Sequence, residues 1–127
     1  MQRLILKGAG VFAVANACYM WVATRHWYNS VPGVQQTGAL NGHFAGDVAL
    51  AFMVSGAALI WAGVRRDSSA GACGAAWLVG HAVGHFGICA QRGFPLDAVA
   101  ATNLAGIQLP AVLALWAVLT LHRSDAR

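Results

Sequence analysis

Two pairs of metal-ligating side chains stand four residues apart inside apolar stretches of the sequence. His43 and Asp47 form one pair, and His81 and His85 form the other. Residues i and i+4 lie on the same face of an α-helix, so each pair presents its two groups side by side. Imidazole nitrogens suit Zn, Cu and Fe, and a carboxylate offsets part of the charge of a divalent ion. The four residues therefore predict a divalent transition-metal site, with Asn41 or Asn103 as a hydrogen-bonding neighbour of the ligands.

The same side chains are open to other interpretations. A buried pair of His81 and Asp47 would have only a structural role, fixing the register of two helices. Haem or quinone ligation is a further alternative. A haem bound from both faces would need His43 opposite His81 or His85, or a second subunit, because two histidines on one helix lie on the same side. Asp and His are also suited to a proton relay, since their surroundings can move their pKa values toward neutrality.

The composition indicates the environment in which these residues must be positioned. Of the 127 residues, 58% are hydrophobic and 9% are charged, whereas a soluble domain carries about 25% charged residues. The chain has 8 Lys and Arg against 4 acidic residues, all of them Asp. So few charges are too few to cover a water-soluble domain, and the composition predicts an integral membrane protein. The basic residues are scattered, which argues against nucleic acid as a partner and for contact with a lipid bilayer.

Four segments are long and apolar enough to cross a bilayer, which takes about 20 residues. They cover about residues 4–24, 43–64, 70–90 and 97–121. Residues 25–42 are the only substantial loop, and they contain several turn-forming Pro and Gly residues. The sequence predicts an all-α fold, an integral membrane four-helix bundle that forms a single domain over residues 1–127.

The positive charges predict an orientation in the membrane. With four spans of alternating direction, both termini and the connection between the second and third spans share one side. That side carries six basic residues and the other carries two, Arg25 and Arg92. The six are Arg3, Lys7, Arg65, Arg66, Arg123 and Arg127. Because cytoplasmic loops are enriched in Lys and Arg, we expect cytoplasmic N- and C-termini.

This orientation places the ligand-type residues at similar depth. At a rise of about 1.5 Å per residue, Asp47 lies about 6 Å inside the outer edge, His85 about 7 Å and His81 about 13 Å. The four candidate ligands therefore fall in the outer layer of the second and third spans, which are antiparallel neighbours in the sequence. The agreement is partly independent of the metal hypothesis, because the topology rests on Lys and Arg alone.

Glycine spacing and one proline predict how the helices pack. Gly42 and Gly46 flank one polar pair, and Gly80 and Gly84 flank the other. Small residues four apart let helices approach closely, so we expect the second and third spans to pack tightly there, with a homodimer face as the alternative. Pro110 has no backbone N–H and predicts a kink in the fourth span.

The stretch Trp27-Tyr28, Val31-Pro32-Gly33-Val34, Thr37-Gly38, Asn41, His43-Phe44 and Asp47 carries a resemblance. It resembles a signature of small four-span bacterial membrane proteins of uncharacterised function. The general plan also resembles the DoxX-like group of small four-helix membrane proteins, by architecture only. The resemblance implies a bacterial inner membrane location and implies no catalytic residue or substrate.

Three function classes follow from these observations. The first is a small inner-membrane protein with a transition-metal-binding or redox-related site near the outer face. The second is a non-catalytic accessory or scaffold subunit of a larger membrane complex. The third is a proton- or solute-conducting oligomer, since four short helices leave little room for transport in one chain. The partners expected are therefore the lipid bilayer and either further copies of the chain or other membrane subunits.

Overall fold

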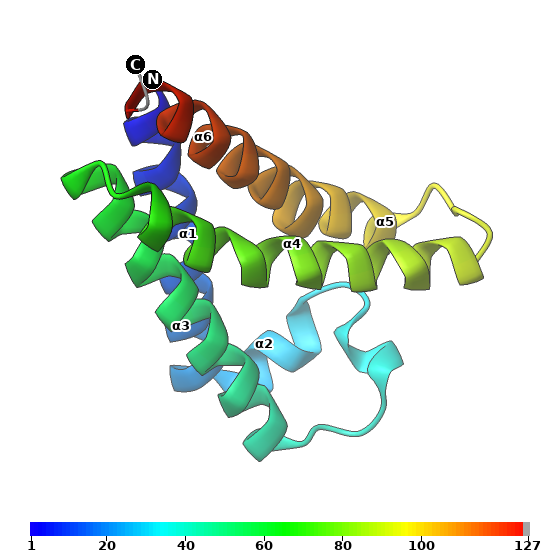
Figure 1. The fold of residues 1–127 in the computed structure, drawn as a ribbon. Helices are drawn as coiled ribbons and strands as arrows, with labels where there is room; N and C mark the ends of the chain where they lie inside the picture. The colour runs from blue at the N-terminus through cyan, green and yellow to red at the C-terminus, as the bar shows by residue number, and fades with distance from the viewer. Residues whose placement is uncertain (126–127) are drawn as a thin grey trace.

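A computed structural model describes residues 1–125, with side chains described through Leu121. Every regular element in this range is helical (Figure 1). In chain order the elements are α1 (Gln2–Val22), α2 (Thr24–Ser30), the 3-10 turn η1 (Val34–Thr37), α3 (Gly42–Arg65), α4 (Ser68–Gln91), α5 (Ala98–Asn103), the π-helical turn η2 (Leu104–Gln108) and α6 (Leu109–Asp125).

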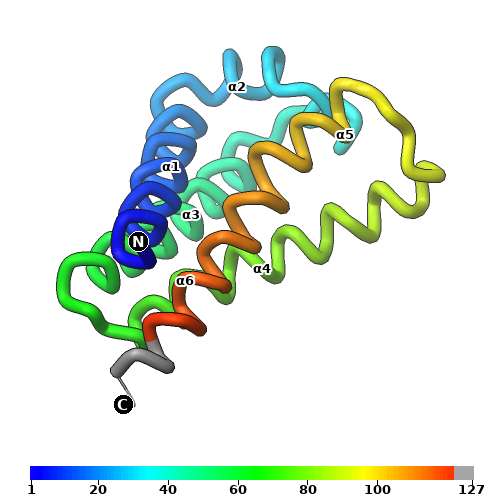
Figure 2. The backbone as a smooth tube through the Cα atoms, turned by 90° about the horizontal axis from the view of Figure 1, so that it is seen from above, coloured from blue at the N-terminus to red at the C-terminus, as the bar shows by residue number. Residues whose placement is uncertain are grey.

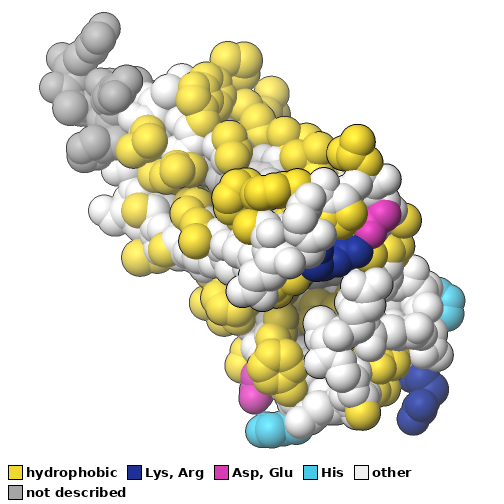
Figure 3. Space-filling view, turned by 90° about the vertical axis from the view of Figure 1, so that its right-hand side faces the viewer, with side chains coloured by type: hydrophobic (Ala, Val, Ile, Leu, Met, Phe, Trp, Pro, Cys, Tyr) yellow, Lys and Arg dark blue, Asp and Glu magenta, His cyan; other side chains and the backbone are white. Residues whose placement is uncertain are grey.

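The predicted membrane spans are confirmed as helices. Four helical stretches are long and apolar enough to cross a bilayer: Gln2–Val22, Gly42–Arg65, Ser68–Gln91 and Ala98–Leu121. Their outer faces expose large apolar side chains, among them Leu50, Val54 and Trp61 on α3. Figure 3 shows one face on which hydrophobic side chains far outnumber charged ones. A water-soluble bundle would present the opposite pattern, so the chain is a multi-pass membrane protein built as a helical bundle.

Three helices begin at side chains that cap their first free N–H groups. The carboxamide of Asn41 accepts from the Phe44 amide at 3.1 Å at the start of α3. Asp67 accepts from the Ala70 amide at 2.9 Å at the start of α4. Asp97 accepts from the Ala100 amide at 2.9 Å at the start of α5. Asn and Asp are favoured caps because the first four amides of a helix lack partners within it.

Close packing within the chain depends on glycines. A Cβ placed on Gly56 of α3 would lie 2.6 Å from the Gly10 carbonyl oxygen of α1. A Cβ on Gly74 of α4 would lie 2.8 Å from the Ser55 carbonyl oxygen of α3. The Ser55 hydroxyl also donates to the Gly74 carbonyl at 2.7 Å. These contacts bring α1 against α3 and α3 against α4, around a core of small and aliphatic side chains.

The tight packing predicted at the glycines beside the polar pairs is wrong. A Cβ on Gly42, Gly46, Gly80 or Gly84 would meet nothing within 4 Å. Helices α3 and α4 meet nearer to their connecting turn and separate toward their other ends (Figure 1). The glycine contact between α3 and α4 is therefore at Gly74, and the alternative of an interface with another chain stays open for Gly80 and Gly84.

The fourth span is continuous but irregular just before Pro110, where the sequence predicts a kink. Five residues just before the proline, Leu104–Gln108, form one wide π-helical turn. In this turn the Leu109 amide donates to the Leu104 carbonyl, five residues back. The irregularity is therefore a wide turn that joins α5 to α6 within one helical stretch. Turns of this kind are common at functional sites, and this one directly follows Asn103.

Residues 25–42 include most of a short helix that the turn signals do not predict. Helix α2 directly follows α1, and its Trp27 packs against the core. The Tyr28 hydroxyl donates to the Gly38 carbonyl at 2.7 Å, which closes the segment on itself. In Figure 2 the segment lies across the end of the bundle away from the start of α1. It had no helical signal in the sequence because seven residues are too few for a clear period.

The basic residues separate between the two ends of the bundle as expected. The start of α1, the α3–α4 turn and the end of α6 lie at one end (Figures 1 and 2). There the Arg3 guanidinium donates to the carbonyls of Gly63 at 2.9 Å and Val64 at 3.2 Å, tying α1 to the end of α3. Arg127 and the side chain of Arg123, both counted in the charge argument, lie outside the described part of the chain.

Candidate metal site on helix α4

His81 and His85 lie side by side on α4, one turn apart. Their ring centroids are 4.5 Å apart and the ring planes are inclined by 55°. Both side chains are half-buried. The i, i+4 spacing produces this proximity, as the sequence predicts. Two nitrogens bound to one ion at 2.0–2.1 Å lie at most about 4 Å apart. Rings whose centroids are 4.5 Å apart can bring one nitrogen each within that distance, so the pair can serve as two ligands of one ion.

Aromatic side chains hold His81 on two sides. The Trp77 ring, one turn earlier on α4, stacks on His81 with centroids 5.5 Å apart and planes inclined by 22°. The Phe52 ring of α3 meets His81 edge-on, with centroids 5.2 Å apart. Phe52 also meets Trp77 edge-on at 5.9 Å, so the three rings form one packed group. This packing restricts rotation of the His81 ring and fixes the direction of its nitrogens.

His85 has a polar neighbour from another helix. The side chain of Asn103, the last residue of α5, lies next to His85. Asn103 is only 7% exposed, one of the few buried polar residues of the bundle. In metal sites, a polar partner beside the second ring nitrogen orients a ligating imidazole and selects the nitrogen that faces the ion. The expectation that Asn103 lies next to the candidate ligands is therefore confirmed for His85.

The two imidazoles line an open groove of about 410 Å³ along α4. Every residue that lines it comes from this one helix: Ala76, Trp77, Gly80, His81, Gly84, His85 and Ile88. No other part of the described chain forms a second wall. The indole N–H of Trp77 is buried and has no hydrogen-bond acceptor among the described residues. The groove is therefore open to the outside of the bundle.

His43 and Asp47 form a separate pair at the start of α3. Their Nε2 and Oδ2 atoms are 3.6 Å apart, and the side chains are 90% and 65% exposed. Through the described range, no group of three or more His, Cys, Asp or Glu side chains is placed to hold a metal ion. The structure therefore gives two pairs instead of one group of four, because α3 and α4 separate toward these ends (Figure 1). The buried pair of His81 and Asp47 is likewise not formed.

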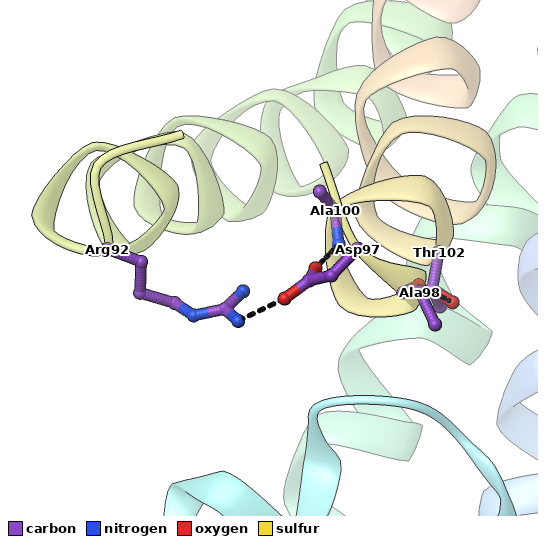
Figure 4. A network of polar contacts seen from close by, with 5 residues as sticks. All are labelled: Arg92, Asp97, Ala98, Ala100 and Thr102. Carbon is purple, nitrogen blue, oxygen red and sulfur yellow. Dashed lines mark hydrogen bonds and ion pairs between the residues drawn. The ribbon is translucent and has the colours of Figure 1, made fainter. Parts of the chain in front are cut away.

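A polar network fixes the helix that carries Asn103 (Figure 4). The Asp97 carboxylate accepts from the Ala100 amide at 2.9 Å and from the Arg92 guanidinium. The Ala100 hydrogen bond and then the Arg92 hydrogen bond hold the pKa of Asp97 below its usual value. The Thr102 hydroxyl donates to the Ala98 carbonyl at 2.8 Å. The network anchors α5 to the end of α4, and so sets Asn103 opposite His85.

Sequence reasoning missed two residues of this site, Phe52 and Trp77. Trp77 lies four residues before His81, so its place on the same face follows from the helical period. Phe52 gives no such signal, because its contact with His81 depends on how α3 crosses α4.

Comparison of the chain with protein-family models, with curated proteins and with solved structures gave no match.

Proposed function

We propose that this membrane protein binds a divalent transition-metal ion through His81 and His85. The observation that carries the proposal is the placement of two imidazoles 4.5 Å apart on one face of α4, beside an open groove. Ionisable residues within membrane spans are costly and rare, and they mark functional sites by default. Imidazole pairs suit Zn, Cu and Fe, which are the ions we expect.

The surroundings of the pair support metal binding over a purely structural role. A structural histidine pair would be satisfied by the chain around it, whereas these rings border a groove that the described chain leaves open. Trp77 and Phe52 hold one ring in place, and Asn103 orients the other. Such fixed rings lose little freedom when they bind an ion. His43 and Asp47 are left out of the proposed site because they are exposed to the exterior.

We further propose that the chain lies in a bacterial inner membrane with cytoplasmic termini. The argument is the excess of basic residues at the end that carries the termini and the α3–α4 turn. With this orientation the His81–His85 pair lies in the outer half of the bilayer. An ion would therefore reach it from the extracytoplasmic side.

Direct metal binding tests the proposal. The protein is purified in mild detergent, stripped with a chelator and titrated with Zn²⁺ by equilibrium dialysis, with bound metal measured by mass spectrometry. His81→Ala and His85→Ala should each weaken binding by about 100-fold or more, since each removes one ligand. The matched control is the other i, i+4 pair: His43→Ala and Asp47→Ala should leave the affinity unchanged.

Three results would overturn the proposal. The first is wild-type protein that binds no Zn²⁺, Cu²⁺ or Fe²⁺. The second is binding that survives in the His81→Ala/His85→Ala double variant. The third is a Soret band in the visible spectrum of the protein as isolated, which would show that the histidines ligate haem instead of a free ion.

A further inference from the structure

The groove face of α4 has the packing features of a helix–helix contact but no helix against it. A Cβ on Gly80 or Gly84 would meet nothing within 4 Å. Where helices of this chain touch, glycines stand at the contact, as at Gly10, Gly56 and Gly74. Small residues spaced by four serve in membranes to bring two helices together. Gly80 and Gly84 have this spacing and lack the neighbouring helix.

The proposed metal site on the same face is incomplete. Zinc sites are almost always tetrahedral, with four protein ligands in structural sites and three in catalytic sites. His81 and His85 supply two, and among the side chains described, through Leu121, no third His, Cys, Asp or Glu joins them. Each histidine directly follows one of the two glycines in the sequence, so a helix that docked on the glycines would approach the imidazoles as well.

A second copy of the chain would supply both the helix that the Gly80–Gly84 face lacks and the further ligands that the metal site lacks. In a two-fold symmetric dimer the same surface of each copy faces the other. Contact through Gly80 and Gly84 would therefore set the His81–His85 pair of one copy opposite the same pair of its partner. The face carries no charged residue that would repel its own image, since the groove is lined by Ala, Gly, Trp, His and Ile. Four imidazoles would then surround one point.

We propose that two copies of this chain pair through the Gly80–Gly84 face of α4 and share one metal ion held by four imidazoles. This inference rests on the proposed function, because it assumes that His81 and His85 bind metal. It adds the partner, the stoichiometry and the residues that form the contact. Two-fold pairing also makes metal binding and assembly depend on each other, since anything that binds only the dimer favours it.

Cobalt tests the proposal because Co²⁺ reports both occupancy and geometry through its visible absorption. Detergent-purified protein is titrated with Co²⁺, and its mass is followed by light scattering. We expect saturation at about one ion for every two chains, a strong tetrahedral absorption band and a dimer stabilised by the metal. Leucine at the contact should block the approach, so Gly84→Leu should be monomeric and bind Co²⁺ at least about tenfold more weakly.

The matched control is Gly8→Leu, which also adds a side chain at a helical position with nothing within 4 Å, on α1. It should dimerise and bind as the wild type does. Circular dichroism of both variants checks that the helices are retained. If Gly84→Leu were to lose its helical signal, the smaller Gly84→Val, read in the same two assays, would decide the outcome.

The outcomes separate this inference from the proposed function. Saturation at one ion per chain on a monomer, lost in His81→Ala, would overturn the shared site and leave metal binding intact. A dimer that persists in Gly84→Leu would overturn the contact. Cobalt binding that does not depend on His81 or His85 would overturn both proposals. Stoichiometric isolation with a different membrane subunit against α4, in place of a second copy, would overturn the homodimer.

Discussion

Replacing Gly56 with alanine tests the packing on which the whole arrangement depends. A Cβ at this position would lie 2.6 Å from the Gly10 carbonyl oxygen and 2.8 Å from a Val14 methyl carbon. Ordinary van der Waals contact begins at 3.4 Å, so the first contact is about 0.8 Å too short. Backbone atoms of α1 cannot turn aside as a flexible side chain would. The two helices must therefore separate.

The expected cost follows from two opposed effects. Overpacking a close contact typically costs about 1–3 kcal/mol. Alanine favours the helix over glycine by about 1 kcal/mol, which offsets part of that cost. We therefore expect Gly56→Ala to lower the free energy of unfolding by up to about 2 kcal/mol. Gly46→Ala is the control on the same helix: with nothing within 4 Å it should gain up to about 1 kcal/mol.

Reversible unfolding in mixed micelles of mild detergent and SDS, followed by circular dichroism, measures both variants against the wild type. The decisive quantity is the sign of the difference in the free energy of unfolding between the two variants. If Gly56→Ala were as stable as Gly46→Ala, α1 and α3 would not approach each other at Gly10 and Gly56, and the packing described above would be wrong.

Three further predictions concern single side chains. Ser55→Ala removes the buried hydrogen bond to the Gly74 carbonyl and should lower stability by about 0.5–1.5 kcal/mol in the same assay; an unchanged value would mean that the bond contributes nothing. Asn103→Ala should weaken Zn²⁺ binding by about 10–100-fold through loss of the partner of His85, with the helical content retained; equal affinity would show that Asn103 does not orient the ring. The pKa of Asp97 is lowered in the folded protein, so its stabilising effect is present above its unfolded pKa, about 3.9, and is lost as the pH falls through the folded value. Acid titration of unfolding should therefore lose part of its pH dependence in Asp97→Ala, and an unaltered profile would contradict the assignment.

Much of the fold could be predicted because local rules determine it. The apolar runs are long enough to cross a bilayer, so the four spans lie within two residues of the predicted ends. Pro110 has no N–H to donate, so an irregularity of the helix near it could be predicted. The pairing of His81 with His85 follows from the helical period alone, and so does that of His43 with Asp47.

The convergence of the two pairs could not be predicted, because it depends on how α3 crosses α4. Gly56, Gly74 and Gly84 look alike in the sequence, and nothing local says which of them touches another helix. Gly56 touches α1, and Gly74 touches α3 in the half of α4 nearer the α3–α4 turn; the far ends of α3 and α4 stand apart. That choice leaves Gly84 open, and it moves His43 away from the other pair.

The wide turn at Leu104–Gln108 acts as one extra residue in the fourth span. Successive residues of an α-helix are turned by about 100° around its axis, so an extra residue shifts the phase of everything before it by about that angle. A regular helix here would carry Asn103 about a quarter of the way around, off the line to His85. The polar contact of α5 with α4 is thus tied to a local irregularity in the backbone, and shortening that turn by one residue would rotate the carboxamide away from the imidazole.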